Sequence, residues 1–253
     1  MRLKWQPWHY SRPDTVTDQL SGFQLFHYDE VASTNDAAKD YAARGETQPA
    51  VFIADRQTGG RGRSGNSWES PVGNLYMSCV LFRDMPAKNA GQYSFLTAVA
   101  LFDTIQPYLA NHQTLALKWP NDLLLDDKKL AGILLESNVL DGRLNWLVIG
   151  VGINLAYAPD YAAKLGDQID RLKFAETLLS NVSSLSQVIE RSGFKSIRKR
   201  WLGHAARLGK NIQVRLPRET LSGTFETIDE DGCLILKQDK KRQRIASGDV
   251  FFE

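Results

Sequence analysis

Cysteine is almost absent from this 253-residue sequence, which contains only Cys79 and Cys233. Two cysteines cannot build a disulfide framework, and no C-x-x-C pair or Cys/His cluster indicates zinc. Both lie among apolar neighbours, which predicts two buried thiols. No apolar run reaches about 18 residues, so no membrane-spanning helix is expected. Residues 1–13 carry charges and two prolines without an apolar stretch, so we expect no signal peptide and a reducing, cytoplasmic setting.

A strong excess of one charge is also missing. The sequence has 31 Lys and Arg against 29 Asp and Glu, a formal net charge of +2. This balance argues against wholesale binding to nucleic acid or to a membrane. Hydrophobic residues make up 43% of the chain, as in ordinary soluble globular proteins, so a sizeable core can form without disulfides or a metal.

The apolar patterns predict an α+β fold, a mixed sheet flanked by helices. Turn signals at 126–129 and at Asp141-Gly142 join neighbouring strands as hairpins, which favours this fold over an alternating parallel sheet. One helix is expected to begin near Ser33 or Thr34, with a hydroxyl capping the first turn, and to end at Arg44-Gly45. Further helices are expected over 92–109, 168–190 and 193–207, and strands over 50–54, 74–82, 115–119, 123–125, 130–136 and 145–155.

The two ends of the chain differ from this middle part. The first thirty residues show no clear periodicity and are too few for a separate DNA-binding domain. After Gly209, short strands are expected over 212–216, 221–228, 233–236 and 244–246. Strands this short at this spacing predict a small barrel. We therefore expect two domains, 1–207 and 208–253.

A loop at 59–65 combines four glycines with Arg61 and Arg63. It fits G-x-G-x-x-G, but Pro71 and Gly73 break the helix that a dinucleotide site needs directly after the glycines. Walker A and protein-kinase motifs are absent. Glycine allows close backbone approach, and arginine provides paired donors for carboxylate or phosphate. A mobile loop that closes over an anion is therefore expected, with a solvated turn as the plain alternative.

Two further segments suggest a site. Lys118 ends a predicted strand whose alternation places Leu115 and Leu117 on the opposite face, and Trp-Pro-Asn-Asp122 follows it. Asn121 and Asp122 offer oxygen atoms suited to a turn, to Mg2+ or to a ribose. The glycines of Gly150-Val-Gly-Ile-Asn154 indicate either a bulge or close approach of a ligand or another backbone.

Taken together, these segments resemble the biotin protein ligases over about residues 25–253. The matching stretches are Ser33-Thr-Asn35, Gln57-Thr-Gly-Gly-Arg-Gly-Arg63 with Trp68 beyond, Asn74-Leu-Tyr76, Lys118-Trp-Pro-Asn-Asp122, Lys129-Leu-Ala-Gly-Ile-Leu134 and Gly150-Val-Gly-Ile-Asn154. The resemblance implies a catalytic domain of the class II aminoacyl-tRNA synthetase-like, biotin-lipoate ligase type and an SH3-like C-terminal barrel. It also implies a ligase that joins biotin to ATP, with Mg2+, and transfers biotin to one lysine of a carboxylase's carrier domain.

The resemblance also implies roles for individual residues. The biotin pocket would comprise Ser33, Thr34, Asn35, Gln57, Arg61, Gly62, Arg63, Lys118, Gly132 and Gly152. The ATP and Mg2+ site would comprise Arg63, Trp68, Asn121, Asp122 and Asn154, with Asn121 and Asp122 as metal ligands. Lys118 and Arg63 would be catalytic, Lys118 by bridging the biotin carboxylate and the α-phosphate.

Some features differ from the family, and alternatives stay open. Ser64 and Asn66 stand where the family often has two more loop arginines, and a helix-turn-helix domain found in some members is missing, so no repressor role is expected. Competing functions are a lipoate or octanoate ligase or transferase of the same fold, or a non-catalytic biotin sensor. The loop at 59–65 lacks the lipoate-type Arg-Arg-x-Ser-Gly-Gly-Gly pattern. Exposed strand edges suit either the acceptor or a second copy of the chain.

Overall fold

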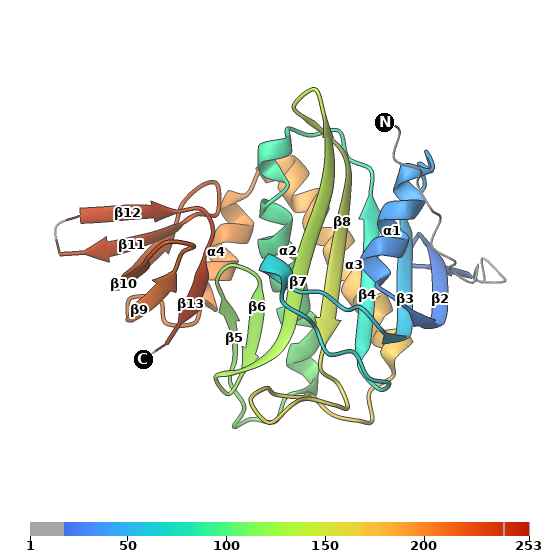
Figure 1. The fold of residues 1–253 in the computed structure, drawn as a ribbon, viewed down its shortest axis with the longest axis horizontal. Helices are drawn as coiled ribbons and strands as arrows, with labels where there is room; N and C mark the ends of the chain where they lie inside the picture. The colour runs from blue at the N-terminus through green and yellow to red at the C-terminus, as the bar shows by residue number, and fades with distance from the viewer. Residues whose placement is uncertain (1–17, 240, 253) are drawn as a thin grey trace.

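A computed structural model describes residues 18–239 and 241–252, which form two β-sheets and four α-helices (Figure 1). The larger sheet has the strand order β1-β2-β3-β4-β8-β7-β6-β5. Its strands are β1 (Asp18–Leu20), β2 (Phe23–Val31), β3 (Ala50–Gln57), β4 (Leu75–Leu81), β5 (Leu115–Lys118), β6 (Asp122–Leu125), β7 (Lys128–Leu140) and β8 (Arg143–Ile153). The helices are α1 (Thr34–Ala43), α2 (Gln92–Ile105), α3 (Arg171–Ser192) and α4 (Lys195–Gly203), with 3-10 turns at Arg63–Gly65, Ala87–Asn89 and Gln106–Tyr108.

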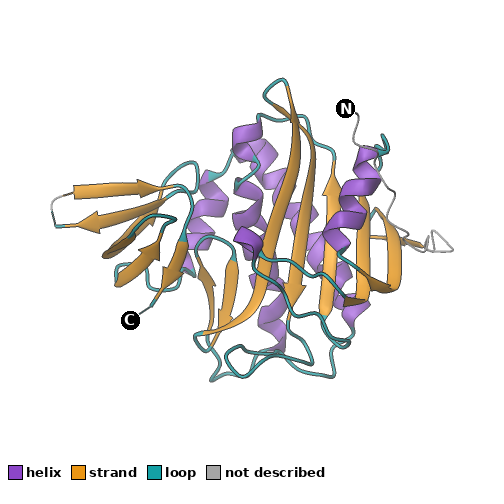
Figure 2. Cartoon of the chain, in the orientation of Figure 1, coloured by secondary structure: helices purple, strands orange, loops and turns teal. Residues whose placement is uncertain are grey.

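The helices cover the two faces of the sheet unequally. Along β8, Leu147, Ile149 and Val151 join the large core cluster that also contains residues of α2, α3 and α4. Val148, between them, joins the smaller cluster beneath α1. Figure 2 shows the same division, with α1 on the near face and the other helices behind the strands. The near face beyond α1 is therefore left open for a site.

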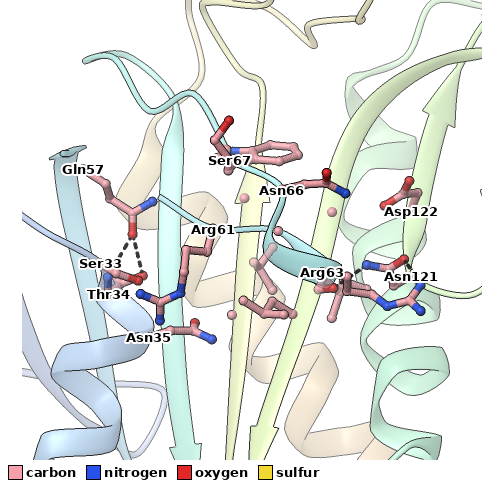
Figure 3. Close-up of a pocket in the computed structure, with 18 of the residues that line it drawn as sticks. Ser33, Thr34, Asn35, Gln57, Arg61, Arg63, Asn66, Ser67, Asn121 and Asp122 are labelled. Atoms are coloured by element: carbon pink, nitrogen blue, oxygen red, sulfur yellow. Dashed lines mark hydrogen bonds between the residues drawn. The ribbon is translucent and has the colours of Figure 1, made fainter. Parts of the chain in front are cut away.

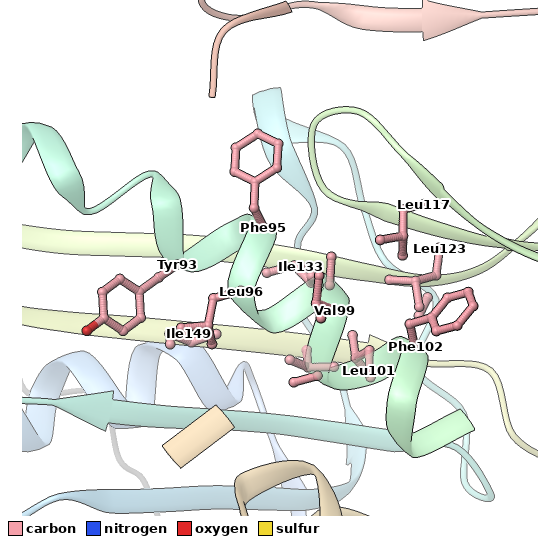
Figure 4. Close-up of a cluster of buried hydrophobic side chains, with 14 of the residues drawn as sticks. Tyr93, Phe95, Leu96, Val99, Leu101, Phe102, Leu117, Leu123, Ile133 and Ile149 are labelled. Carbon is pink, nitrogen blue, oxygen red and sulfur yellow. The ribbon is translucent and has the colours of Figure 1, made fainter. Parts of the chain in front are cut away.

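Helix α2 supplies the centre of the large core. Leu96, Val99 and Leu101 are buried and pack towards Ile133 and Ile149 of the sheet (Figure 4). A helix that is buried on nearly all sides reads as apolar over most of its length, as this one does. It thereby fixes the central strands from behind.

One parallel strand pair determines where the site forms. Strands β2 and β3 run parallel, with Val31 opposite Gln57, whereas the other pairs of this sheet are antiparallel. Parallel neighbours need a crossover, and α1 provides it. The carboxyl ends of parallel strands lie at one edge of the sheet. The start of α1 and the end of β3 therefore meet there.

The C-terminal sheet is antiparallel, with the order β12-β11-β10-β9-β13. Its strands are β9 (Asn211–Arg215), β10 (Thr220–Ile228), β11 (Leu234–Gln238), β12 (Lys241–Ile245) and β13 (Asp249–Phe251). Trp201 of α4 packs edge-on against Phe95 of α2 at 5.3 Å between ring centres, and Phe225 of β10 lies 6.4 Å from Trp201. The Trp119 indole donates a 3.0 Å hydrogen bond to the carbonyl of Gly232. The two sheets therefore share one continuous apolar core.

The predicted fold class is confirmed, since a mixed sheet carries helices and a five-stranded antiparallel sheet follows it. Both hairpins form, with positive φ at Asp126, Asp127, Asp141 and Gly142, and both cysteines are buried. The expectation about residues 1–13 lies outside the described residues.

Some element bounds differ from the prediction. Helix α2 stops at Ile105, and a 3-10 turn containing Pro107 replaces its last part, because proline lacks the N–H that a continued helix needs. Helix α3 begins at Arg171, where the Asp170 side chain accepts hydrogen bonds from the amides of Leu172 and Lys173. Strands β2 and β13 were not predicted.

Candidate active site

A pocket lies on the open face of the larger sheet. Beneath it, cross-strand pairing places residues of five neighbouring strands in one row across the sheet. The row runs from Tyr76 through Gly152, Gly132 and Asp122 to Lys118. The pocket is lined by Ser33, Thr34, Asn35, Gln57, Arg61, Gly62, Arg63, Asn66, Ser67, Trp68, Asn121, Asp122, Lys129, Gly132, Ile133, Leu134, Gly150, Val151, Gly152 and Asp249. Most residues that the sequence predicts for the site thus line one cavity (Figure 3).

The first turn of α1 forms the polar end of the pocket. The Gln57 side-chain oxygen accepts hydrogen bonds from the Thr34 amide at 2.8 Å and the Thr34 hydroxyl at 3.1 Å. Thr34 and Ser78 share a 2.7 Å hydrogen bond, and the Ser78 hydroxyl donates to Asn35 Oδ1 at 2.5 Å. These buried groups fix one another. A short chain of amides and hydroxyls is therefore presented in a fixed arrangement.

Ser33 does not cap the helix as predicted. It occupies the N-cap position in an extended conformation, but its side chain makes no capping hydrogen bond. The Thr34 hydroxyl is engaged by Gln57 and Ser78. The polar groups at this helix start serve the pocket rather than the helix, which gives up the usual stabilisation of a cap.

The glycines of β7 and β8 make room for side chains. A Cβ on Gly150 would overlap the side-chain amide of Asn35, and a Cβ on Gly152 would lie 2.7 Å from the Trp68 indole. On Gly132 it would lie 3.2 Å from the same indole. The sequence left open a bulge or the close approach of a ligand or another backbone, but β8 pairs regularly here and side chains fill the space instead. The groups that approach are Asn35 and Trp68, and the Trp68 ring forms a wall directly above the glycines.

The glycine and arginine loop folds as a turn over the pocket. The Gly62 amide donates to the Asn66 carbonyl at 2.7 Å, and the Trp68 amide donates to the Gly60 carbonyl at 2.9 Å. Ser64 and Gly65 adopt positive φ at the tip. The two arginines diverge from this turn (Figure 3). Arg61 points towards α1, while Arg63 reaches the opposite wall.

The contacts of Arg63 differ in kind from those of a surface ion pair. Its guanidinium donates to Asn121 Oδ1 at 3.2 Å and to the Ser247 hydroxyl at 3.1 Å. Asn121 Oδ1 and the Ser247 hydroxyl are both neutral acceptors. Ser247 lies in the C-terminal segment between β12 and β13, so Arg63 connects the loop both to Asn121, beside the larger sheet, and to the C-terminal sheet.

Two lysines lie near this wall, and only one of them lines the pocket. Lys129, at the start of β7, forms a 2.8 Å ion pair with Asp122 and lies 5.3 Å from the centre of the Trp68 ring. Lys118 is half-buried beyond Asp122, with its ammonium 5.2 Å from the Phe252 ring and 5.9 Å from the Phe251 ring. Burial lowers the pKa of Lys118 below its ordinary value, although the charge of Asp122 opposes the shift.

The predicted metal ligands are already engaged with cations. Asn121 accepts from Arg63, and its amide donates to the Ile133 carbonyl at 2.6 Å. Asp122 is paired with Lys129. Among residues 18–239 and 241–252, no three His, Cys, Asp or Glu side chains gather as a metal site. Since this donor set holds only one carboxylate, the assignment of Asn121 and Asp122 as metal ligands stays a prediction.

Asn154, predicted to bind ATP, is buried outside the pocket wall. Its side-chain amide donates to the Ala163 carbonyl at 3.0 Å, and its backbone carbonyl accepts from the Leu165 amide at 3.0 Å. These bonds anchor the segment that follows β8.

Comparison with known proteins gives a consistent result. The family model described as "Biotin/lipoate A/B protein ligase family" matches residues 28–154, and "Biotin protein ligase C terminal domain" matches residues 208–253. The biotin--[acetyl-CoA-carboxylase] ligase of Paracoccus denitrificans is 37% identical over 87% of this chain and 97% of its own length. The chain belongs to the biotin protein ligase family.

Other biotin protein ligases agree with this result. The bifunctional ligase/repressor BirA of Bacillus subtilis is 32% identical over 92% of this chain and 75% of its own length. A biotin protein ligase from Aquifex aeolicus, solved in complex with biotin and ATP, matches 90% of this chain and 97% of its own with a TM-score of 0.74 and 25% identity. The resemblance carried by the six sequence motifs is thus confirmed, and the protein is an enzyme with ligase activity. In the described part of the chain, no helix is long and apolar enough to cross a membrane.

Several pocket residues of this biotin protein ligase could not be assigned from the sequence. Lys129 lies within a family motif, but nothing in that motif indicates from the sequence alone that Lys129 lines the pocket. Ser78 reaches Asn35 only because β4 lies beside β8 and beneath α1. Asp249 lines the pocket from the C-terminal sheet, 97 residues after Gly152, and no local signal marks it.

Proposed function

We propose that this ligase activates biotin with ATP and transfers it to a lysine of the biotin carrier domain of a carboxylase. In the first step a biotin carboxylate oxygen attacks the α-phosphorus, pyrophosphate leaves, and biotinyl-5'-AMP forms. In the second step the acceptor lysine amine attacks the acyl carbon and AMP leaves. The observation that supports this most is the pocket itself, which joins a fixed polar end to a wall carrying Lys129 and Arg63.

The cations address the main difficulty of the first step, which brings two anions together. Two like unit charges ~4 Å apart repel by roughly 4 kcal/mol at an effective dielectric constant of about 20. A cation placed between them turns this repulsion into attraction and gains more as charge moves to the leaving pyrophosphate. Lys129 lines the pocket but is paired with Asp122, whereas Lys118 lies beyond Asp122 in the same row of the sheet and has no carboxylate at ion-pair distance among the described residues. We therefore propose Lys118 for the bridging role. Arg63, which donates to neutral groups at the same wall, is proposed as the second cation.

The polar end of the pocket is proposed to receive the ureido ring of biotin. Ser33, Thr34, Asn35 and Gln57 supply hydroxyl and amide groups there, and Trp68 supplies an apolar wall. A ring with adjacent N–H and C=O groups needs acceptors and donors held at fixed positions, which the hydrogen bonds among Thr34, Asn35, Ser78 and Gln57 provide. ATP is proposed to lie towards Arg63 and Lys129, and any Mg2+ enters bound to ATP.

Biotin-dependent exchange of pyrophosphate into ATP tests the proposal. We expect exchange with biotin and none with lipoate. Exchange with lipoate alone would make the protein a lipoate ligase, and tight biotin binding without exchange would make it a sensor.

A matched pair of lysine variants tests the assignment within the site. We expect Lys118→Met to lower the exchange rate by about 100-fold, as for removal of one group that stabilises the transition state. Lys129→Met should lower it less, and both variants should keep the circular dichroism spectrum of the parent. The reverse order would move the bridging role to Lys129.

A further inference from the structure

The two arginines of the 59–65 loop have different partners. Arg61 donates from both terminal nitrogens to the two carboxylate oxygens of Asp36, each at 2.6 Å. Asp36 lies in the first turn of α1, directly after the Ser33-Thr-Asn35 segment. Paired bonds between guanidinium and carboxylate are among the strongest and most directional hydrogen bonds in proteins. The Arg61 guanidinium is therefore held on α1, at the pocket that Arg61 helps to line.

Asp36 is itself held by a wider cluster of alternating charges. Lys39 lies 3.0 Å from Asp36 and 2.6 Å from Glu136 of β7. Glu136 also accepts a 2.9 Å hydrogen bond from the side-chain amide of Asn35 and lies 3.7 Å from Arg61. Burial would raise the pKa of Asp36, but the hydrogen bonds from Arg61 and Lys39 outweigh it and lower that pKa below its ordinary value. Asp36 therefore stays ionised in any neutral buffer.

The far end of the loop is attached to the same helix turn. The Gln57 amide donates to the Ser70 hydroxyl at 3.0 Å, and that hydroxyl donates to the Trp68 carbonyl at 2.9 Å. Gln57 in turn accepts from Thr34. The first turn of α1 thus contacts the loop near its start through Arg61 and near its end through Gln57 and Ser70.

We propose that Asp36 is a positioning residue that anchors the 59–70 loop over the pocket through Arg61. Arg61 then acts as a loop anchor, and Arg63 is the loop arginine that acts on the substrates. The anchoring is a property of the fold. Its consequence for catalysis rests on the proposed function, so the two are measured separately.

Hydrogen exchange of the 59–66 amides measures the anchoring without any substrate. Asp36→Asn, Arg61→Gln and the double variant are compared with the parent. Asp40→Asn is the matched control, because it removes the same charge from the same helix, and in the described part of the chain the Asp40 side chain makes no hydrogen bond or ion pair with the loop. We expect about fivefold faster exchange in the first three, equal among them, and no change in Asp40→Asn.

The kinetic comparison separates an anchor from a substrate ligand. If Arg61 only anchors, Asp36→Asn, Arg61→Gln and the double variant raise the KM for biotin by the same factor of about five in the pyrophosphate exchange assay. Additive losses, or a far larger loss in Arg61→Gln than in Asp36→Asn, would show that Arg61 contacts substrate and would overturn the proposal. Unchanged loop exchange in Asp36→Asn would overturn it as well. Failure of all variants and the parent to exchange pyrophosphate would count against the proposed function only.

A measurement on the parent protein covers the case in which a variant fails to fold. The Asp36 side chain is 25% exposed and that of Arg61 38%, so salt screens their pairing. Raising NaCl from about 0.05 M to about 0.5 M should speed exchange of the 59–66 amides severalfold. A loop insensitive to salt would contradict the anchor.

Discussion

At the scale of single residues, the glycines of Gly150-Val-Gly-Ile-Asn154 show how a motif can be recognised without its geometry. The sequence indicates that something comes close to the backbone, and the family resemblance suggests that it is biotin. The structure places Asn35 against Gly150 and Trp68 against Gly152. These contacts join residues more than 80 positions apart. No local pattern in the sequence could identify the partners.

Replacement of Gly150 by alanine should therefore disturb the polar end of the pocket. The added methyl group overlaps the amide of Asn35, which must leave its hydrogen bond with Ser78. We expect a loss of stability of about 1–3 kcal/mol, as for overpacking, with weaker biotin binding. Urea denaturation and titration calorimetry measure the two effects. Gly91→Ala is the control, because its Cβ meets nothing within 4 Å at a φ of −58°.

Lys118 gives a prediction about pH. Its pKa in the folded chain is lowered from 10.5, chiefly by burial. Between the two pKa values the unfolded chain binds more protons, so stability rises with pH there, and the charged lysine costs stability below that range. We expect Lys118→Met to be at least as stable as the parent at pH 7, with the difference shrinking towards pH 10. Urea denaturation at both pH values tests this, and a strongly destabilised variant at pH 7 would contradict it.

At the scale of elements, the patterns predict most of the architecture and miss parts that depend on distant contacts. The expected helices all form, because their apolar spacing and end signals agree with the packing. Strand β2 is missed because only its first half is buried in alternation, while Asp29 and Glu30 near its end are exposed. Strand β13 is short, and its Gly248-Asp249 start resembles a turn. It becomes a strand only by pairing with β9.

The same limit applies to the site. The motif residues on α1, β3 and the loop are found because they lie close together in sequence. Asp36 and Glu136 are 100 residues apart, and both reach Lys39 only because Glu136 of β7 pairs with Val148 of β8, which packs beneath α1.

The loop gives a prediction at this scale. The tip residues Ser64, Gly65 and Asn66 are exposed, and glycine lowers the cost of local opening. Trypsin should cleave after Arg63 in the protein alone, and biotin plus ATP should slow this cleavage by at least about tenfold as anions engage the loop. Timed digestion followed by mass spectrometry identifies the site. AMP alone serves as the control, and equal cleavage in all conditions would argue against closure on the substrates.

At the scale of the whole molecule, the shared core predicts that the two sheets unfold together. Trp201 is 1% exposed and packs between Phe95 and the C-terminal sheet. Trp201→Ala should cost about 3–5 kcal/mol. Calorimetry should show one transition in the parent and in the variant. Two separated transitions in the parent would mean that residues 1–207 and 208–253 are thermodynamically independent.

The contacts of the turn at Gly232 have a consequence for the design of chimeric ligases. Its φ of +84° favours glycine, a Cβ there would press into the Phe95 ring, and its carbonyl receives the Trp119 indole. Chimeras that exchange the last 46 residues between homologous ligases will therefore have poorly packed contacts between the two sheets unless Phe95 and Trp119 are exchanged as well. In directed evolution of these enzymes, recombination breakpoints should therefore not be placed at the boundary between residues 207 and 208.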